Sequence, residues 1–172
     1  MAPMEVMQEI LQGTNVRQFI PGPVEEEALE RILEAARLAP SAKNRQPWRF
    51  IVIKKESLRE RLQEYCYGDE RITEAGEVVV CCTTNIDYKM PNGQLSYPMD
   101  IAMAASHLMF QARHEGLGAA IMTTYLEQEI RTLLSVPYSM RVVAIVMVGK
   151  TEDEPKPYNR LDGKRIIAYN HW

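Results

Sequence analysis

Cysteine is scarce in this chain of 172 residues: there are three, and two of them, Cys81 and Cys82, are adjacent. An odd number of thiols with this spacing excludes a disulfide framework. We expect all three to be small buried side chains in a reducing cytoplasm. The sequence also lacks the Cys-x-x-Cys and His-Glu-x-x-His patterns that bind zinc. We therefore predict no metal site.

Long apolar runs and an excess of charge are missing as well. No run approaches the roughly 20 residues needed to span a bilayer, and the first residues lack the regions of a signal peptide. Twenty basic residues stand against 23 acidic ones. Without a basic field, the surface is unsuited to nucleic acid or to an anionic membrane. We predict neither partner.

The common catalytic motifs are also absent. There is no Walker A loop, no Gly-x-Ser-x-Gly elbow, no calcium loop, and no nucleophile with an adjacent base. Gly116-Leu117-Gly118 has the form of a dinucleotide fingerprint, but it joins a helix to a strand, whereas a Rossmann loop runs from strand to helix. Any redox or group-transfer chemistry would have to come from a bound cofactor.

The residues that are present predict a folded protein, because 46% of them are apolar, enough for a single domain over residues 1–172. Residues 77–83 are apolar throughout, as in a strand covered on both faces. Ser57 and Glu60 suggest a capping box at the start of a helix. Periodicity predicts helices at 4–12, 25–38, 57–65, 99–115 and 127–134, and strands at 49–54, 77–83, 119–124 and 142–148.

The predicted helix at 99–115 is apolar on nearly every side. Such a helix is usually buried in a core or in an interface. In a domain of this size, burial on every side indicates a subunit interface, so we predict a homodimer in which Leu108 contacts the partner.

A polar loop lies between the second helix and the first strand. Pro40 ends the helix, and Ser41, Asn44 and Gln46 then offer short hydrogen-bonding side chains. Trp48 returns the chain to the core. Such a loop suits a planar, polar ligand, although an ordinary helix–strand connection has the same pattern.

Residues 13–50 resemble the start of the nitroreductase family of FMN-dependent oxidoreductases. Those proteins begin with an Arg-Arg-Ser-x-Arg-x-Phe-like turn, a helix, and then Ala-Pro-Ser-x-x-Asn-x-Gln-Pro-Trp. Gly13 and Asn15 stand where relatives have the first Arg and the Ser. Loss of one charged contact to phosphate would weaken FMN binding by about tenfold to a hundredfold, unless Arg160, Lys164 or Arg165 compensates. The matching residues are Val16, Arg17, Phe19, Pro23, Val24, Leu29, Ile32, Leu33, Ala36, Pro40, Ser41, Asn44, Gln46, Pro47 and Trp48.

The resemblance implies an α+β fold with a central mixed sheet flanked by helices, in an intertwined homodimer. Residues 151–172 would form an extension that packs on the partner subunit. FMN would lie at the interface, with no catalytic side chain because the flavin carries the chemistry. The implied FMN contacts are Thr14, Asn15, Val16 and Arg17 at the phosphate and pyrimidine edge, Pro40, Ser41 and Asn44 from the other subunit, Met122, Thr123 and Thr124 beside flavin N5, and Arg160 at the phosphate.

The implied activity is hydride transfer from NAD(P)H through flavin N5 to a nitroaromatic, quinone or related acceptor by a ping-pong mechanism. The loop between Asn85 and Met99, with Tyr88, Lys89, Met90 and Tyr97, would line the acceptor side. Two alternatives remain open. One is a specialised enzyme of the same fold, such as a reductive dehalogenase or a flavin-destroying synthase. The other is a non-catalytic flavin-binding dimer.

Overall fold

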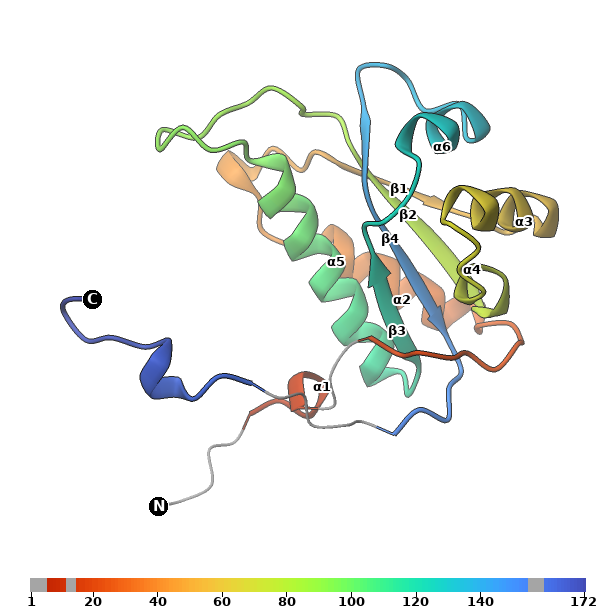
Figure 1. Cartoon of the computed structure of the whole chain (residues 1–172), viewed down its shortest axis with the longest axis horizontal. Coiled ribbons are helices and arrows are strands. Elements are labelled where there is room, and N and C mark those ends of the chain that lie inside the picture. Colours follow the sequence, from red (N-terminus) through yellow and green to blue (C-terminus); the bar gives the residue numbers. More distant parts are fainter. Residues whose placement is uncertain (1–5, 12–14, 155–159) are drawn as a thin grey trace.

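The computed structural model describes residues 6–11, 15–154 and 160–172. Its centre is a four-stranded sheet in the order β1-β2-β4-β3 (Figure 1). The strands are β1 (Trp48–Val52), β2 (Glu77–Thr83), β3 (Gly118–Met122) and β4 (Arg141–Gly149). Helices cover both faces of the sheet, so the predicted α+β class is confirmed.

The expectation of a mixed sheet is wrong for the strands of this chain, because all three pairings are antiparallel. The reason lies in the connections. Between β1 and β2, the helices α3 (Glu56–Tyr65) and α4 (Arg71–Glu74) return the chain to the end of the sheet that it has just left, so that Val52 pairs with Val79. Arg59 stabilises this connection by donating hydrogen bonds to the carbonyl groups of Ile53 and Gly76.

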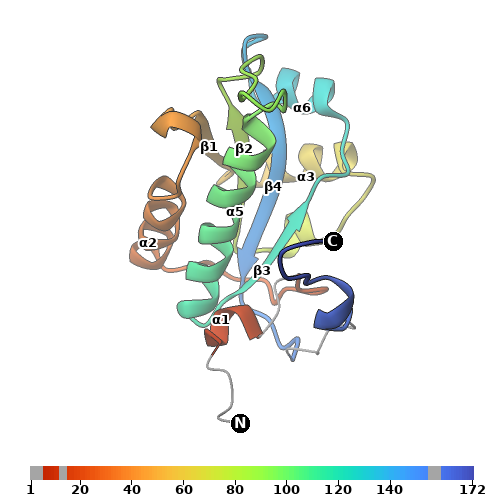
Figure 2. The same cartoon turned by 90° about the vertical axis from the view of Figure 1, so that its left-hand side faces the viewer.

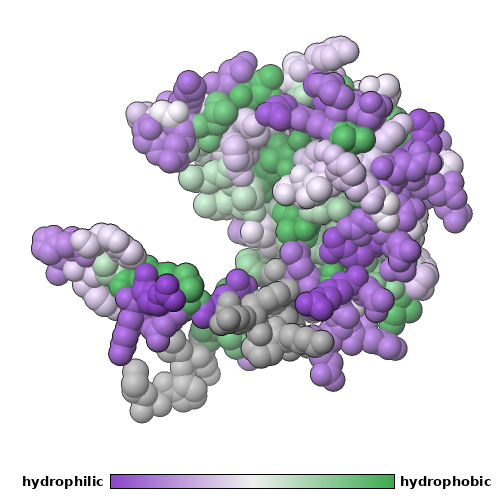
Figure 3. All heavy atoms as spheres, in the orientation of Figure 1, coloured by the Kyte–Doolittle hydropathy of each residue, from purple (hydrophilic) through white to green (hydrophobic). Residues whose placement is uncertain are grey.

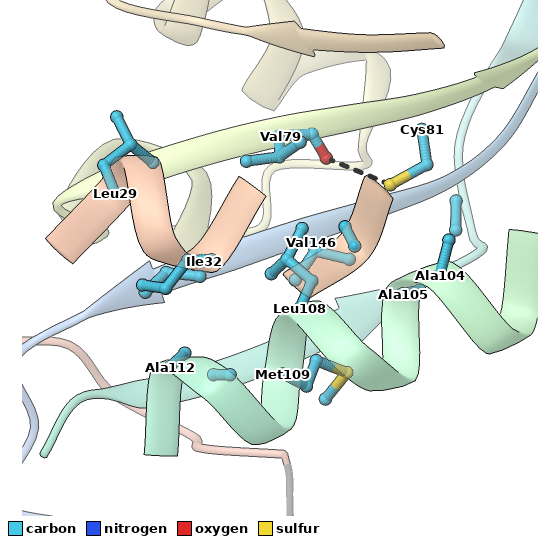
Figure 4. Packing of buried hydrophobic residues seen from close by; sticks show 14 of the residues in the cluster. Leu29, Ile32, Val79, Cys81, Ala104, Ala105, Leu108, Met109, Ala112 and Val146 are labelled. Atoms are coloured by element: carbon cyan, nitrogen blue, oxygen red, sulfur yellow. Dashed lines mark hydrogen bonds between the residues drawn. The ribbon is translucent and has the colours of Figure 1, made fainter. Parts of the chain in front are cut away.

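Two apolar clusters lie on opposite faces of the sheet. On one face, α2 (Glu26–Arg37) and α5 (Tyr97–His114) pack over Val79 and Val146 (Figure 4). On the other, α3, α4 and α6 (Glu127–Leu133) pack over Val78 (Figure 2). Every residue of β2 is buried, which confirms the strand that the continuous apolar run predicted. Within the described residues the three thiols are free and buried, and no group of side chains could hold a metal ion.

Most predicted elements are present with shifts of one or two residues at their ends. The capping box is wrong: α3 begins one residue earlier, Lys55 occupies the N-cap without a side-chain bond, and Ser57 therefore lies inside the first turn. The helix α4 was missed because four residues are too few for a periodic signal. Gly116, just after the end of α5, adopts a φ of 76°, as expected of a glycine that ends a helix. The described part of the first predicted helix is α1 (Gln8–Leu11).

The helix α5 has two distinct faces. Leu108 is fully buried in the chain's own core, so the prediction that it contacts a partner subunit is wrong. The face of α5 that carries Leu108, Ala104, Ala105 and Ala112 packs on the sheet (Figure 4). The large apolar residues of α5 that face outward are Met99 and Met103, which are 47% and 41% exposed.

The C-terminal segment, residues 160–172, is exposed along its whole length and stands away from the sheet and its helices (Figures 1 and 2). It contains a short helix, η2 (Gly163–Arg165). Figure 3 shows hydrophobic atoms on this segment and on the body of the protein across a wide hollow. Its large exposed apolar side chains are Leu161, Ile166, Ile167, Tyr169 and Trp172.

Among the described residues, no helix has the length and apolarity required to cross a membrane.

Candidate functional site

The first group of predicted site residues lies along the outer edge of β3. The amide of Val16 donates to the carbonyl of Ala119 over 3.0 Å, and the side-chain oxygen of Asn15 accepts from the amide of Ile121 over 2.9 Å. Both contacts use the edge of β3 that faces away from β4. The structure therefore brings Asn15, Val16 and Arg17 beside the strand that leads into Met122, Thr123 and Thr124. Thr14 lies outside the described residues, as does Gly13.

Two side chains that the sequence did not identify hold this N-terminal turn. Asp153 accepts hydrogen bonds from the amides of Arg17 and Gln18. Arg71 donates to the carbonyl of Val16 over 3.3 Å and forms an ion pair of 2.6 Å with Asp69. Its hydrogen bond lowers the pKa of the Asp69 carboxyl. No sequence signal links Asp153 and Arg71 to the turn, because their contacts with it span more than fifty positions.

The backbone contacts leave the side chain of Arg17 exposed to solvent. Within the part of the chain that the structure describes, its guanidinium makes no hydrogen bond or ion pair. A fixed main chain with an unpaired guanidinium can meet an anionic group without breaking an existing contact. The turn is thus suited to a phosphate or to a developing negative charge.

The second group forms the loop around η1 (Ala42–Asn44). The side-chain oxygen of Ser41 accepts from the amide of Gln46 over 2.9 Å, and a hydroxyl that accepts one bond keeps its hydrogen for another. Lys43, Asn44 and Gln46 all have left-handed backbone conformations, with φ of 53°, 53° and 49°. Each such conformation costs a non-glycine residue roughly 1–2 kcal/mol, and strain of this kind gathers at functional sites. The polar loop is present where the sequence predicted it, and three of its residues have left-handed conformations.

Asp100 is a buried carboxylate, 2% exposed, in the first turn of α5. One oxygen accepts the amide of Ala42 over 2.8 Å. The other, Oδ2, is buried and has no hydrogen-bond partner among the described residues. Because buried acceptors are nearly always paired, this oxygen marks a place where a donor is still to be supplied. An acidic residue at the start of an otherwise apolar helix was the sequence signal for it.

The two groups lie at opposite edges of the sheet. The η1 loop leads directly into β1, one edge strand, while the Asn15–Arg17 turn lies against β3, the other. Three inter-strand spacings separate these edges, or about 14 Å. Arg160 is exposed and begins the C-terminal segment, residues 160–172, which stands away from the sheet in Figure 1. The predicted residues of a single chain therefore lie at two separate edges of the sheet.

The fold is a three-layer α+β arrangement, with helices on both faces of one antiparallel sheet. The model of the nitroreductase family matches residues 12–97 and 69–150. The chain belongs to the nitroreductase family, and it is an oxidoreductase.

Individual relatives agree with this assignment. A protein of Archaeoglobus fulgidus, described as a candidate NADH dehydrogenase/NAD(P)H nitroreductase, is 29% identical over 163 residues, which cover 92% of each chain. The solved FMN-dependent nitroreductase of Clostridium difficile R20291 is 27% identical, with a TM-score of 0.82 over 96% of this chain and 100% of that one. The iodotyrosine deiodinase of Thermotoga neapolitana is 26% identical over 157 residues, covering 80% of this chain and 83% of its own.

Proposed function

We propose that this protein is an FMN-dependent NAD(P)H oxidoreductase. The observation that carries the proposal is the pair of polar edges of the sheet, each made of residues that the family resemblance assigns to flavin binding. When bound, FMN supplies two-electron chemistry at N5, taking hydride from NAD(P)H and passing it to a nitroaromatic, quinone or related acceptor by a ping-pong mechanism. The side chains then bind, orient and shield, and none acts as an acid or base.

The β3 edge would hold the flavin ring and the phosphate. The carbonyl of Ala119 and the amide of Ile121 point outward from β4. Thr123 directly follows β3. If the alternation of the strand continues by one residue, its amide would be directed to the same edge and could donate to N5. Arg17 would place positive charge near N1 and O2, which favours the reduced, anionic ring. Arg160 would contribute to phosphate binding.

The η1 loop of the other subunit would complete each site through Pro40, Ser41 and Asn44. The outward apolar surface at Met99 and Met103 fits a subunit contact, because large apolar side chains cluster at interfaces. We further propose that residues 1–172 form one domain, that residues 151–172 pack on the partner, and that the protein, with its free buried thiols, resides in the cytoplasm.

A specialised dehalogenase-like activity is the second candidate. It is favoured by the similarity to the iodotyrosine deiodinase of Thermotoga neapolitana. In the present chain the segment after β2 folds into a small hairpin, in which Lys89 pairs with Leu95 and the amide of Ser96 donates to the carbonyl of Tyr88 over 3.1 Å. Turnover of a halogenated phenol, compared with turnover of a nitrofuran, separates the two activities.

The deciding experiment is one visible absorption trace. Protein is loaded with FMN, desalted, and mixed with NADPH without oxygen. A retained flavin band that bleaches supports both FMN binding and hydride acceptance. No flavin band after desalting, or a band that neither NADPH nor NADH bleaches, would overturn the proposal.

A further inference from the structure

Two cations converge on one aromatic ring at the η1 loop. The guanidinium carbon of Arg45 lies 3.9 Å from the centroid of the Tyr88 ring, and the ammonium nitrogen of Lys43 lies 5.7 Å from it. Tyr88 belongs to the segment between β2 and α5, so the contact joins that segment to the η1 loop. At these distances a cation is attracted by the negative face of the ring.

The surroundings of the two cations are basic, although the protein as a whole has a net charge of −3. From Glu34 to Glu56 the chain has six basic residues and no acidic residue between them (Arg37, Lys43, Arg45, Arg49, Lys54 and Lys55). The 23 acidic residues of the protein all lie outside this stretch. Arg37 pairs with Glu34 and Lys54 pairs with Glu26 and Glu77. The other four cations form no ion pair among the described residues, and two of them, Lys43 and Arg45, lie in the η1 loop.

Neither cation is neutralised within the described part of the chain. Arg31, Arg71 and Arg141 each have a carboxylate partner at 2.6–2.8 Å, whereas Lys43 and Arg45 form no ion pair with any described residue. The acids nearest in sequence do not fill that role. Asp87, beside Tyr88, is exposed and makes no ion pair there, and Asp100 binds the amide of Ala42.

We propose that Lys43 and Arg45 bind the 2′-phosphate of NADPH. The protein would then prefer NADPH to NADH, which has a hydroxyl at the same position. The inference rests on the proposed function. An arginine stacked flat on a ring keeps its N–H edge for two parallel bonds to phosphate, and a lysine adds a point charge. Both residues flank Asn44, one of the proposed flavin contacts, so they would lie beside that proposed site and could meet the distant end of a nucleotide stacked on the flavin.

The size of the preference follows from the chemistry of the two reductants. Hydrogen bonds to charged groups are worth about 1.5–3 kcal/mol each, and 1.4 kcal/mol corresponds to a tenfold change in affinity. We expect kcat/KM for NADPH to exceed that for NADH by more than about tenfold. Because the phosphate is remote from the hydride, the difference should appear in KM rather than in kcat.

The test is the rate of flavin bleaching by each nucleotide without oxygen, which requires no knowledge of the acceptor. In the variant with both Lys43→Gln and Arg45→Gln, kcat/KM for NADPH should fall about tenfold or more while that for NADH changes by less than about twofold. The matched control is Lys55→Gln with Arg61→Gln, two exposed cations at α3, which should keep the wild-type ratio. Equal use of both nucleotides by the wild type, or an unchanged ratio in the double variant, would overturn the inference.

A binding measurement separates this inference from the proposed function. Adenosine 2′,5′-bisphosphate should bind the FMN-loaded wild type at least about tenfold more tightly than AMP, and the double variant should lose that difference. If neither nucleotide bleaches the flavin, the proposed function fails, and the bisphosphate titration still decides the phosphate site. If the double variant instead loses only the turnover of an anionic acceptor such as 4-nitrobenzoate, the cations serve the acceptor and the inference is wrong.

Discussion

The amide of Ala42 donates to Oδ1 of Asp100 across 2.8 Å and thereby fixes the η1 loop to the first turn of α5. The contact spans 58 positions of the chain. Its acceptor is almost completely buried, and the second oxygen of the same carboxylate has no partner among the described residues. The loop geometry and the position of α5 are consequently coupled.

Replacing Asp100 tests this coupling. In Asp100→Ala the loop loses the acceptor that offsets its backbone strain, and we expect the Kd for FMN to rise about tenfold, equivalent to 1.4 kcal/mol. Asp100→Asn keeps a carbonyl oxygen and should show a smaller loss. Fluorescence titration of FMN measures both, with Asp87→Ala as the exposed control and circular dichroism to verify folding. An unchanged Kd in Asp100→Ala would show that the loop does not need this bond.

Arg17 offers a second test on the opposite edge of the sheet. Its main chain is held by Asp153 and its side chain is exposed, so Arg17→Ala should leave the melting temperature unchanged. Loss of the charge should raise the Kd for FMN about tenfold or slow flavin reduction by a similar factor. Arg61→Ala, which removes an exposed cation on α3, is the control. Wild-type values for both quantities would remove Arg17 from the site.

The dimer prediction now depends on the outward face of α5. Met103→Glu places a charge on a side chain that is 41% exposed in the single chain, so the fold should survive while an apolar subunit contact is lost. We expect sedimentation to show monomers at concentrations where the wild type is dimeric. Tyr138→Glu, at a side chain that is 90% exposed, is the matched control. A Met103→Glu protein that remains dimeric would exclude this face from the interface.

The ion pair between Arg31 and Glu115 predicts a pH dependence of stability. The hydrogen bond from Arg31 lowers the pKa of Glu115 from 4.5 to about 2. A lowered pKa means that this contribution is present above pH 4.5 and is lost as the pH falls toward 2. Because the pair is partly exposed, Glu115→Gln should cost about 1 kcal/mol of unfolding free energy at pH 7.

The difference between wild type and Glu115→Gln should therefore shrink as the pH falls from 4.5 to 2. Thermal unfolding across this range measures it, with Glu129→Gln, an exposed carboxylate on α6, as the control. A difference that is the same at pH 7 and pH 2.5 would contradict the role of the ionised carboxylate.

The sequence by itself determined the elements whose signals are local. The apolar run of β2 needed no partner to be recognised, and the stripe of α2 followed from its own periodicity. Pro40 and the polar residues after it marked a loop because their backbone preferences act within a few positions. The family followed from this same stretch, and the family model confirms it.

Tertiary structure alone decided which surfaces meet. The composition of α5 could not show that Leu108 faces the sheet while Met103 faces outward, because an apolar helix has no polar stripe to orient it. Asp153, Arg71 and Asp100 support the two polar edges through contacts between distant parts of the chain, which leave no local pattern. The distance between those edges depends on strand order, and strand order is set by packing over the whole domain.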